Sequence, residues 1–175
     1  MNEIIEQLAE FVDNMVVQHD YPGFEPRSLK LGLPDSINKS SPKIFSQALQ
    51  HPNVYVKLAA LRWFQSKPGM GKGREKTIAS LLQDQDDWVK MEALRALERL
   101  RTSDESILLL MAPLLQNKNA QVRKTAAKAL GKICAKQHKK IEPVIVSLRT
   151  AAEDPEPEVR WKAQKALRLL GEYES

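Results

Sequence analysis

Several common features are missing from this sequence, and each absence excludes a class of protein. The 175 residues include a single cysteine, Cys134, which excludes an intramolecular disulfide and makes a reducing compartment the expectation. The N-terminus shows no basic region followed by an apolar run, so it does not resemble a secretory signal. The longest strongly apolar stretch, residues 107–115, is too short to span a bilayer. We therefore expect a soluble, cytoplasmic protein without membrane association.

A convincing catalytic or metal-binding pattern is also lacking. The three histidines have no convergent acid or nucleophile in the sequence. Cys134 and His138 are four residues apart, but two ligands do not make a zinc site. Residues 68–73 are rich in glycine, yet Ser66 and Gly73 stand where a phosphate-binding loop needs glycine and serine or threonine. The sequence predicts no catalytic residue, cofactor or metal, and it favours a non-enzymatic role.

Acidic residues are absent from one long segment. Between Ser106 and Ile141 there is no aspartate or glutamate, although the net charge of the whole chain is only +5. The basic residues of this segment are Lys118, Arg123, Lys124, Lys128, Lys132, Lys136, Lys139 and Lys140. Such a surface attracts an acidic protein or the phosphates of nucleic acid. The alternative is a charged face that is only solvated.

The most informative feature that is present is a block that recurs about every 33 residues. It begins at Val56, Val89, Val122 and Val159, so two steps are 33 residues long and the last is 37. Counted from each valine, apolar residues recur at +4, +7 and +8, and a preceding helix is apolar at −11 and −7. A fixed period of this length predicts helical hairpins that bury their apolar faces by stacking.

The first 41 residues lie outside the repeat. Apolar spacing over residues 1–18 predicts one amphipathic helix, and prolines and glycines predict an irregular connection over residues 19–41. Leu31, Leu33 and Ile37 are expected to pin part of it to the first helices. We therefore divide the chain into an N-terminal helix and connection that cap the stack, residues 1–41, and a repeat domain, residues 42–175.

The recurring pattern Asp-x-x-x-x-Val-Arg-x-x-Ala-x-x-Ala-Leu resembles the HEAT repeat. It is most similar to the short bacterial HEAT-like form found in phycobilisome bilin lyases and related cyanobacterial proteins. Residues 154–167 match it fully, and residues 84–97 match with lysine in place of arginine. The resemblance implies an all-α, right-handed α-solenoid of about four hairpins. It also implies that the face made by the second helices binds a partner.

Four basic residues share one repeat position and are the strongest candidates for binding. Position +6 holds Arg62, Arg95, Lys128 and Lys165, which we call the basic ladder. At 240° around the helix from the valine, this position points away from the apolar stripe. Stacked repeats should therefore align the four side chains on the second-helix face. The alternative is that they are ordinary exposed helix residues.

Other residues join the ladder as binding candidates. Lys124 and Lys132 come from the segment without acidic residues. Tyr55 and Trp88 at position −1, and Trp161 at +2, would serve as interface anchors if they are exposed. Partial burial between repeats is the alternative.

A second basic column has a structural interpretation. Position +1 holds Lys57, Lys90, Arg123 and Arg160. In HEAT-like repeats this residue reaches a carboxylate in an inter-repeat turn. The turn carboxylates available for that contact are Asp84, Asp86 and Asp154.

These features favour a non-enzymatic scaffold, adaptor or assembly chaperone that binds an acidic protein through its basic second-helix face. The resemblance points to phycobiliproteins, which are acidic, as one specific partner. It also implies two alternatives. One is a bilin lyase or lyase subunit, and the other is a nucleic-acid-binding protein similar to HEAT-like DNA glycosylases. The oligomeric state and the partner's identity stay open.

Overall fold

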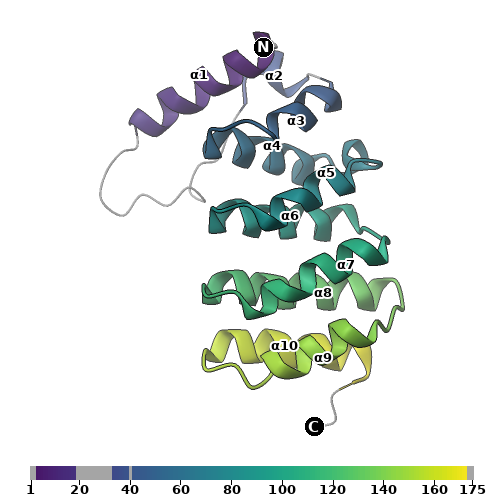
Figure 1. Cartoon of the computed structure of the whole chain (residues 1–175). Helices are drawn as coiled ribbons and strands as arrows, with labels where there is room; N and C mark the ends of the chain where they lie inside the picture. The colour runs from purple at the N-terminus through teal and green to yellow at the C-terminus, as the bar shows by residue number, and fades with distance from the viewer. Residues whose placement is uncertain (1–2, 19–32, 40, 173–175) are drawn as a thin grey trace.

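The described part of the chain is entirely helical apart from turns and loops. This computed structural model describes residues 3–18, 33–39 and 41–172, and those residues form ten α-helices and three short 3₁₀ helices. The helices follow one another down a stack from the N-terminus to the C-terminus (Figure 1). The prediction of an all-α fold built from stacked helical pairs is confirmed.

Four helical pairs follow the predicted repeat. The pairs are α3 (Pro42–Ala48) with α4 (Val54–Ser66), α5 (Glu75–Ala79) with α6 (Asp87–Leu100), α7 (Glu105–Met111) with α8 (Ala120–Lys136), and α9 (Glu142–Ala151) with α10 (Pro157–Leu170). The first helix of the second and third pairs ends in a 3₁₀ turn, η3 (Ser80–Gln83) and η4 (Ala112–Gln116), and η2 (Pro68–Gly71) connects α4 to α5. The four-residue insertion before the last unit falls in the loop after α8.

Two helices precede the pairs. α1 (Glu3–Gln18) packs on α3 and α4, as expected for a helix that caps the stack. α2 (Asp35–Asn38) is a correction, because it lies within the range predicted to be irregular. Its Ile37 is buried, and the indole nitrogen of Trp63 donates a hydrogen bond to the Asn38 carbonyl, so this short turn is docked on α4. Residues 19–32, including Leu31, lie outside the described residues.

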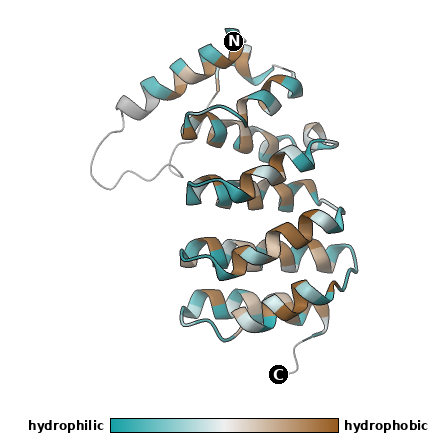
Figure 2. Cartoon of the chain, viewed as in Figure 1, coloured by the Kyte–Doolittle hydropathy of each residue, from teal (hydrophilic) through white to brown (hydrophobic). Residues whose placement is uncertain are grey.

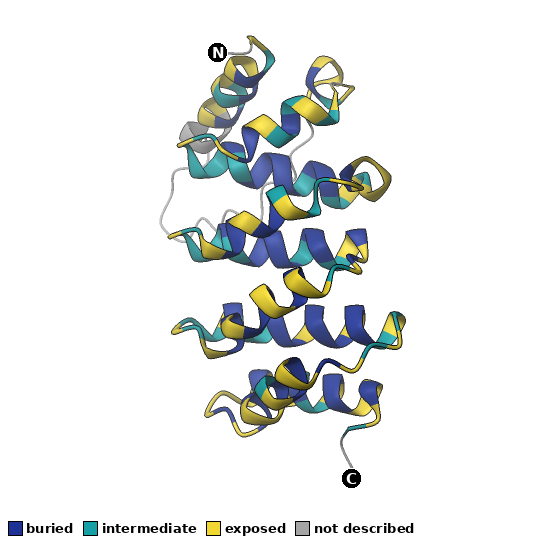
Figure 3. Ribbon diagram, turned by 45° about the vertical axis from the view of Figure 1, so that its right-hand side comes forward, coloured by how far each residue is buried: buried dark blue, intermediate teal, exposed yellow. Residues whose placement is uncertain are grey.

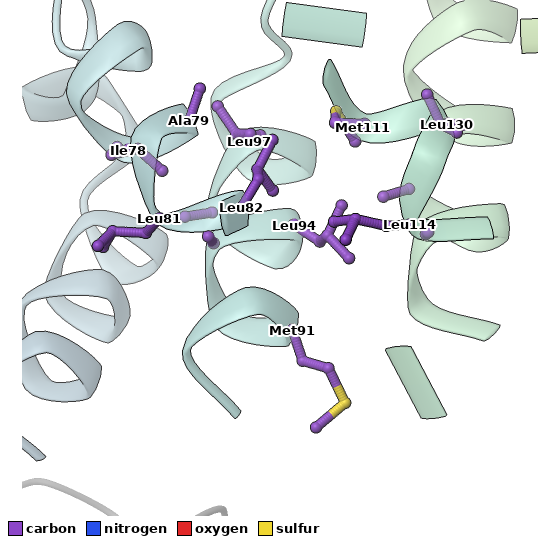
Figure 4. Close-up of a cluster of buried hydrophobic side chains, with 14 of the residues drawn as sticks. Ile78, Ala79, Leu81, Leu82, Met91, Leu94, Leu97, Met111, Leu114 and Leu130 are labelled. Atoms are coloured by element: carbon purple, nitrogen blue, oxygen red, sulfur yellow. The ribbon is translucent and has the colours of Figure 1, made fainter. Parts of the chain in front are cut away.

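The apolar stripes of the helices meet in one continuous core. Second helices pack on one another in the order α4, α6, α8 and α10, and α5, α7 and α9 pack in the same order beside them. Hydrophobic residues lie along the helices, whereas the turns within each pair are hydrophilic (Figure 2). Between the second and third pairs, Leu94 of α6 meets Leu114 of η4, and both are buried (Figure 4).

The alanine column allows the second helices to stack closely. Ala60, Ala93, Ala126 and Ala163 at position +4 are all fully buried, and each helix shows a buried stripe between exposed residues (Figure 3). Small side chains are required here because a larger one would push adjacent helices apart.

Polar side chains determine where each second helix begins. Asn53, Asp86 and Asn119 at position −3 accept hydrogen bonds from backbone amides of the first turn, at 2.8 to 3.0 Å. Free amides at a helix start need such acceptors. The fourth unit has Glu156 at this position without a side-chain cap, and Pro157 begins α10 instead.

The +1 column links successive turns in two of the four units. The Lys57 ammonium lies 2.7 Å from Asp84, and the Arg123 guanidinium lies 2.7 Å from Asp154. Lys90 pairs with Asp87 of its own unit, because the next turn offers Asn117 instead of a carboxylate. The structural interpretation of this column is therefore confirmed where the following turn supplies an aspartate.

Candidate functional site

The second-helix side of the stack is hollowed along its length. A hollow of about 630 Å³ lies between α4, η2, α6 and α8, and a hollow of about 210 Å³ adjoins it beside Arg95 and Lys128. A third, of about 120 Å³, lies between α8 and α10. Lys132 lines all three, so they form one continuous surface that we call the basic groove.

Positive charge is concentrated in this groove. Its basic lining residues are Arg95, Arg99, Arg101, Lys128, Lys132, Lys136, Lys162 and Lys165. Glu98 is the one acidic residue among the lining residues, which gives the groove a formal charge of +7. The whole chain carries only +5, so acidic residues are in excess elsewhere. The groove is therefore the part of the described surface that is best suited to an acidic ligand.

The N-terminal half of the ladder differs from the sequence-based expectation. Arg62 was expected to project from the stack, but its side chain is only 18% exposed and lies 3.5 Å from Glu92. Arg95 lies 2.8 Å from the same carboxylate, whose side chain is 4% exposed. The amide nitrogen of Gln65 donates to it at 2.7 Å. A carboxylate buried to this extent needs such partners, so this pair of arginines has a structural role.

The middle of the ladder is only partly neutralised. Glu98 of α6 lies 2.7 Å from the ammonium of Lys132 and 3.9 Å from that of Lys128. The Lys128 side chain is 44% exposed, and its contact with Glu98 is long for an ion pair. Lys128 therefore keeps most of its charge available to a ligand.

The C-terminal end of the ladder lies beside an exposed tryptophan. The ammonium groups of Lys162 and Lys165 lie 4.2 and 5.1 Å from the centre of the Trp161 ring, which is a cation–π arrangement. Burial lowers the pKa of Lys162, and the nearby charges of Lys128 and Lys165 lower it further. The lysines at this end thus repel one another.

The three aromatic candidates do not share one environment. Tyr55 and Trp88 are partly buried and pack against the core, so for them the alternative of partial burial between repeats holds. Trp161 is 50% exposed and remains a candidate anchor. Lys124, another candidate, lies 2.8 Å from Glu158 of the next unit.

Sequence reasoning missed four basic residues of the groove. Lys162 stands at +3, where the other units hold Ala59, Glu92 and Thr125, so no periodic signal marks it. Arg99, Arg101 and Lys136 lie at the ends of α6 and α8, beyond the recurring block. Their position in the last turn of a long helix, or just after it, was the available signal.

The described residues offer no evident catalytic centre. Within the described ranges, no group of three or more histidine, cysteine, aspartate or glutamate residues is arranged to hold a metal ion. Burial raises the pKa of the Cys134 thiol to about 11, so it is protonated and inaccessible at neutral pH. Among the same residues, no helix has the length and apolar character needed to cross a membrane.

Comparisons with known proteins agree with this architecture. Residues 113–175 match the family model described as HEAT repeats. A crystal structure described as an engineered protein is similar to this chain, with 21% identity and a TM-score of 0.61. The match covers 74% of this chain, which spans 62% of that one, and at this identity it shows the fold alone. No curated protein matches the chain.

Proposed function

We propose that this protein is a non-enzymatic scaffold, adaptor or assembly chaperone that binds an acidic protein partner in the basic groove. The observation that supports this proposal is the concentration of charge: the groove holds eight basic residues and one acidic residue, although the rest of the chain has an excess of acid. HEAT repeats generally mediate protein binding, and the repeat match includes α8, α9 and α10.

The physical role of the groove is to attract and orient the partner. Lysines and arginines on a shared surface raise the rate at which an acidic surface is encountered, and salt screens that attraction. Each exposed charge contributes little by itself, so affinity depends on several contacts made together. A partner with a continuous acidic strip along the stack fits this arrangement.

A phycobiliprotein is the specific partner that the repeat resemblance favours. Two alternatives accompany it. A bilin lyase or lyase subunit would act on the same partner with a bilin present, and a nucleic-acid binder would use the groove lysines for phosphates. The experiment below separates a protein partner from nucleic acid, and recovery of a pigmented protein supports the phycobilisome version.

The test reverses two exposed ladder charges. Lys128 and Lys165 are replaced by glutamate, because Arg95 contacts the buried Glu92 and its reversal would perturb the fold. The matched control places glutamate at Lys43 and Lys76, which are exposed on α3 and α5 of the first-helix layer. Both double variants are compared with wild type in pull-downs from the native host, at low and moderate salt, with and without nuclease.

The proposal expects partner capture to fall strongly for the Lys128/Lys165 variant, to persist for the control, and to weaken with salt. Equal loss in both variants would assign binding to net charge instead of the groove. Loss of the partner on nuclease treatment would assign the groove to nucleic acid. Unchanged capture in both variants would place the binding site elsewhere.

A further inference from the structure

The α8–α10 end of the groove departs from the repeat in two adjacent places. At position +9, α4 has Gln65 and α6 has Glu98, whereas α8 has Gly131. At position +10, the first three units have Ser66, Arg99 and Lys132, whereas the last has Leu169. A polar filler is thus lost and a large apolar side chain is gained at the same end of the groove. Neither change follows from what stacking requires.

These two departures create an apolar hollow. Leu169 is 52% exposed and lines the hollow together with Ala127, Gly131 and Ala166. A β-carbon at Gly131 would lie 2.4 Å from Cβ and 2.8 Å from Cα of Ala166, so glycine lets α8 and α10 approach closely. The floor of the hollow is therefore made of small groups, and Leu169 forms one wall.

The rim of the same hollow is basic. Its remaining lining residues are Lys128, Lys132, Lys162 and Lys165, and no carboxylate is among them. Lys132 is paired with Glu98, which leaves three ammonium groups around the apolar floor without a close carboxylate. Their mutual repulsion, which contributes to the lowered pKa of Lys162, would be relieved by a bound anion.

From this geometry we infer that the α8–α10 end binds a short acidic protein segment in which carboxylates flank one bulky apolar side chain. The apolar side chain enters the hollow against Leu169, and the carboxylates contact Lys128, Lys162 and Lys165. This inference rests on the proposed function and specifies the chemistry of the partner. Charge attracts the segment, and the apolar anchor fixes its register in the groove.

Nucleic acid fits this end of the groove less well than such a segment. The alanine and glycine floor and the Leu169 wall offer no hydrogen-bond donors to phosphate. The face of the Trp161 ring, which would stack on a base, is covered by the ammonium groups of Lys162 and Lys165. The carboxylates of a peptide satisfy those ammonium groups while its apolar residue occupies the hollow.

The test uses fluorescein-labelled synthetic peptides and the full chain. The first peptide carries aspartates and glutamates on both sides of one phenylalanine, and the second has serine in place of that phenylalanine at the same charge. A single-stranded oligonucleotide of equal charge is the third probe. Affinities are measured by fluorescence anisotropy for wild type, Leu169→Ser, and the control Leu110→Ser, which alters a similarly exposed leucine on α7.

We expect wild type to bind the phenylalanine peptide about tenfold more tightly than the serine peptide, as is typical for one side chain in an apolar pocket. Leu169→Ser should remove this preference and Leu110→Ser should retain it, with circular dichroism confirming that both variants are folded. Equal affinity of the two peptides, or a preference that survives Leu169→Ser, would overturn the inference and leave the proposed function intact. Tighter binding of the oligonucleotide than of either peptide would overturn both. Absence of binding by both peptides, together with salt-sensitive partner capture that needs Lys128 and Lys165, would overturn only the inference.

Discussion

Between α4 and α6, Arg62 and Arg95 both reach the buried carboxylate of Glu92, whereas between α8 and α10, Lys162 and Lys165 lie beside Trp161 with no carboxylate lining their hollow. The two regions occupy equivalent places in the repeat and hold the same type of side chain at position +6. One uses the charges to satisfy a buried acid, and the other presents them to solvent. The same repeat position therefore serves the fold in one half and is available for binding in the other.

The difference arises from the neighbours of the ladder residues. In α6, Glu92 stands three residues before Arg95 and also faces Arg62 of the preceding unit. In α10, the equivalent position holds Lys162, so the local charge is doubled instead of cancelled. A lysine or arginine in a repeat column should thus be assigned to binding only after its partners in the adjacent helices are known.

The largest effect is expected where α8 and α10 touch. Gly131→Ala would place a β-carbon against the backbone of Ala166, which cannot rotate away, so we expect a loss of about 3 kcal/mol in unfolding free energy. Gly69→Ala is the control, because nothing lies within 4 Å of a β-carbon there. Urea denaturation measures both. An equal, small change in the two variants would show that the helices do not approach this closely.

Removing the buried acid should separate the two halves of the groove. Glu92→Ala leaves Arg62, Arg95 and Gln65 without their shared acceptor, and we expect a loss of about 2 kcal/mol in unfolding free energy. Glu158→Ala removes the partner of Lys124 from an exposed site and should leave the unfolding midpoint close to that of wild type. Comparable losses in the two variants would remove the distinction between a structural half and a binding half.

Charge reversal at two ladder positions sharpens the same comparison. Arg95→Glu places a second carboxylate beside Glu92, and we expect it to cost about 1.5 kcal/mol. Lys165→Glu, in the exposed half, should change stability by no more than about 0.5 kcal/mol. Thermal unfolding of the two single variants tests this, and a Lys165→Glu cost as large as that of Arg95→Glu would contradict it.

The turn edge should behave alike in both halves, with the smallest effects. The hydrogen bond from Arg123 lowers the pKa of Asp154, while burial tends to raise the pKa of Asp84 but is outweighed by hydrogen bonds from Lys57 and the Asp86 amide. Both carboxylates therefore stabilise the fold above their ordinary pKa of 3.8, and this contribution is lost as the pH falls below it towards their lowered values.

Asp84→Asn and Asp154→Asn should each flatten the decline in stability between about pH 5 and pH 2, and to a similar degree. Denaturation midpoints across that range provide the measurement. A flattening confined to one of the two variants would show that the turn ladder, like the groove, differs between the halves.

Much of the fold could be predicted because it depends on periodic constraints. The valine and alanine columns, the apolar positions of the first helices and the turn residues at −5 and −3 all recur in the sequence, and each has a local or nearest-neighbour cause. The short helix α2 was missed because its four residues lie in a segment rich in prolines and glycines, and its docking depends on Trp63 and Lys67 of α4. No local pattern reports such a contact.

The candidate site was predicted only in part. The ladder position was found because it recurs, and three of its four members, Arg95, Lys128 and Lys165, line the groove. Arg62 was expected to be exposed, and its contact with Glu92 depends on how α4 and α6 face each other. Lys162, Gly131 and Leu169 matter because they differ from the repeat, which a search for recurring residues passes over.

The sequence by itself determined the period, the helical pairs, the order of their stacking and the column of basic residues, because each is set by side-chain size and polarity at fixed spacing along a helix. Only the tertiary structure decided which of those basic residues are neutralised. That outcome depends on distances of a few ångströms between side chains about 30 residues apart, as between Arg62 and Glu92, and on the close approach that Gly131 allows between α8 and α10. Electrostatic and packing energies change steeply over such distances, so they are settled by the packed helices and not by the spacing of residues along the chain.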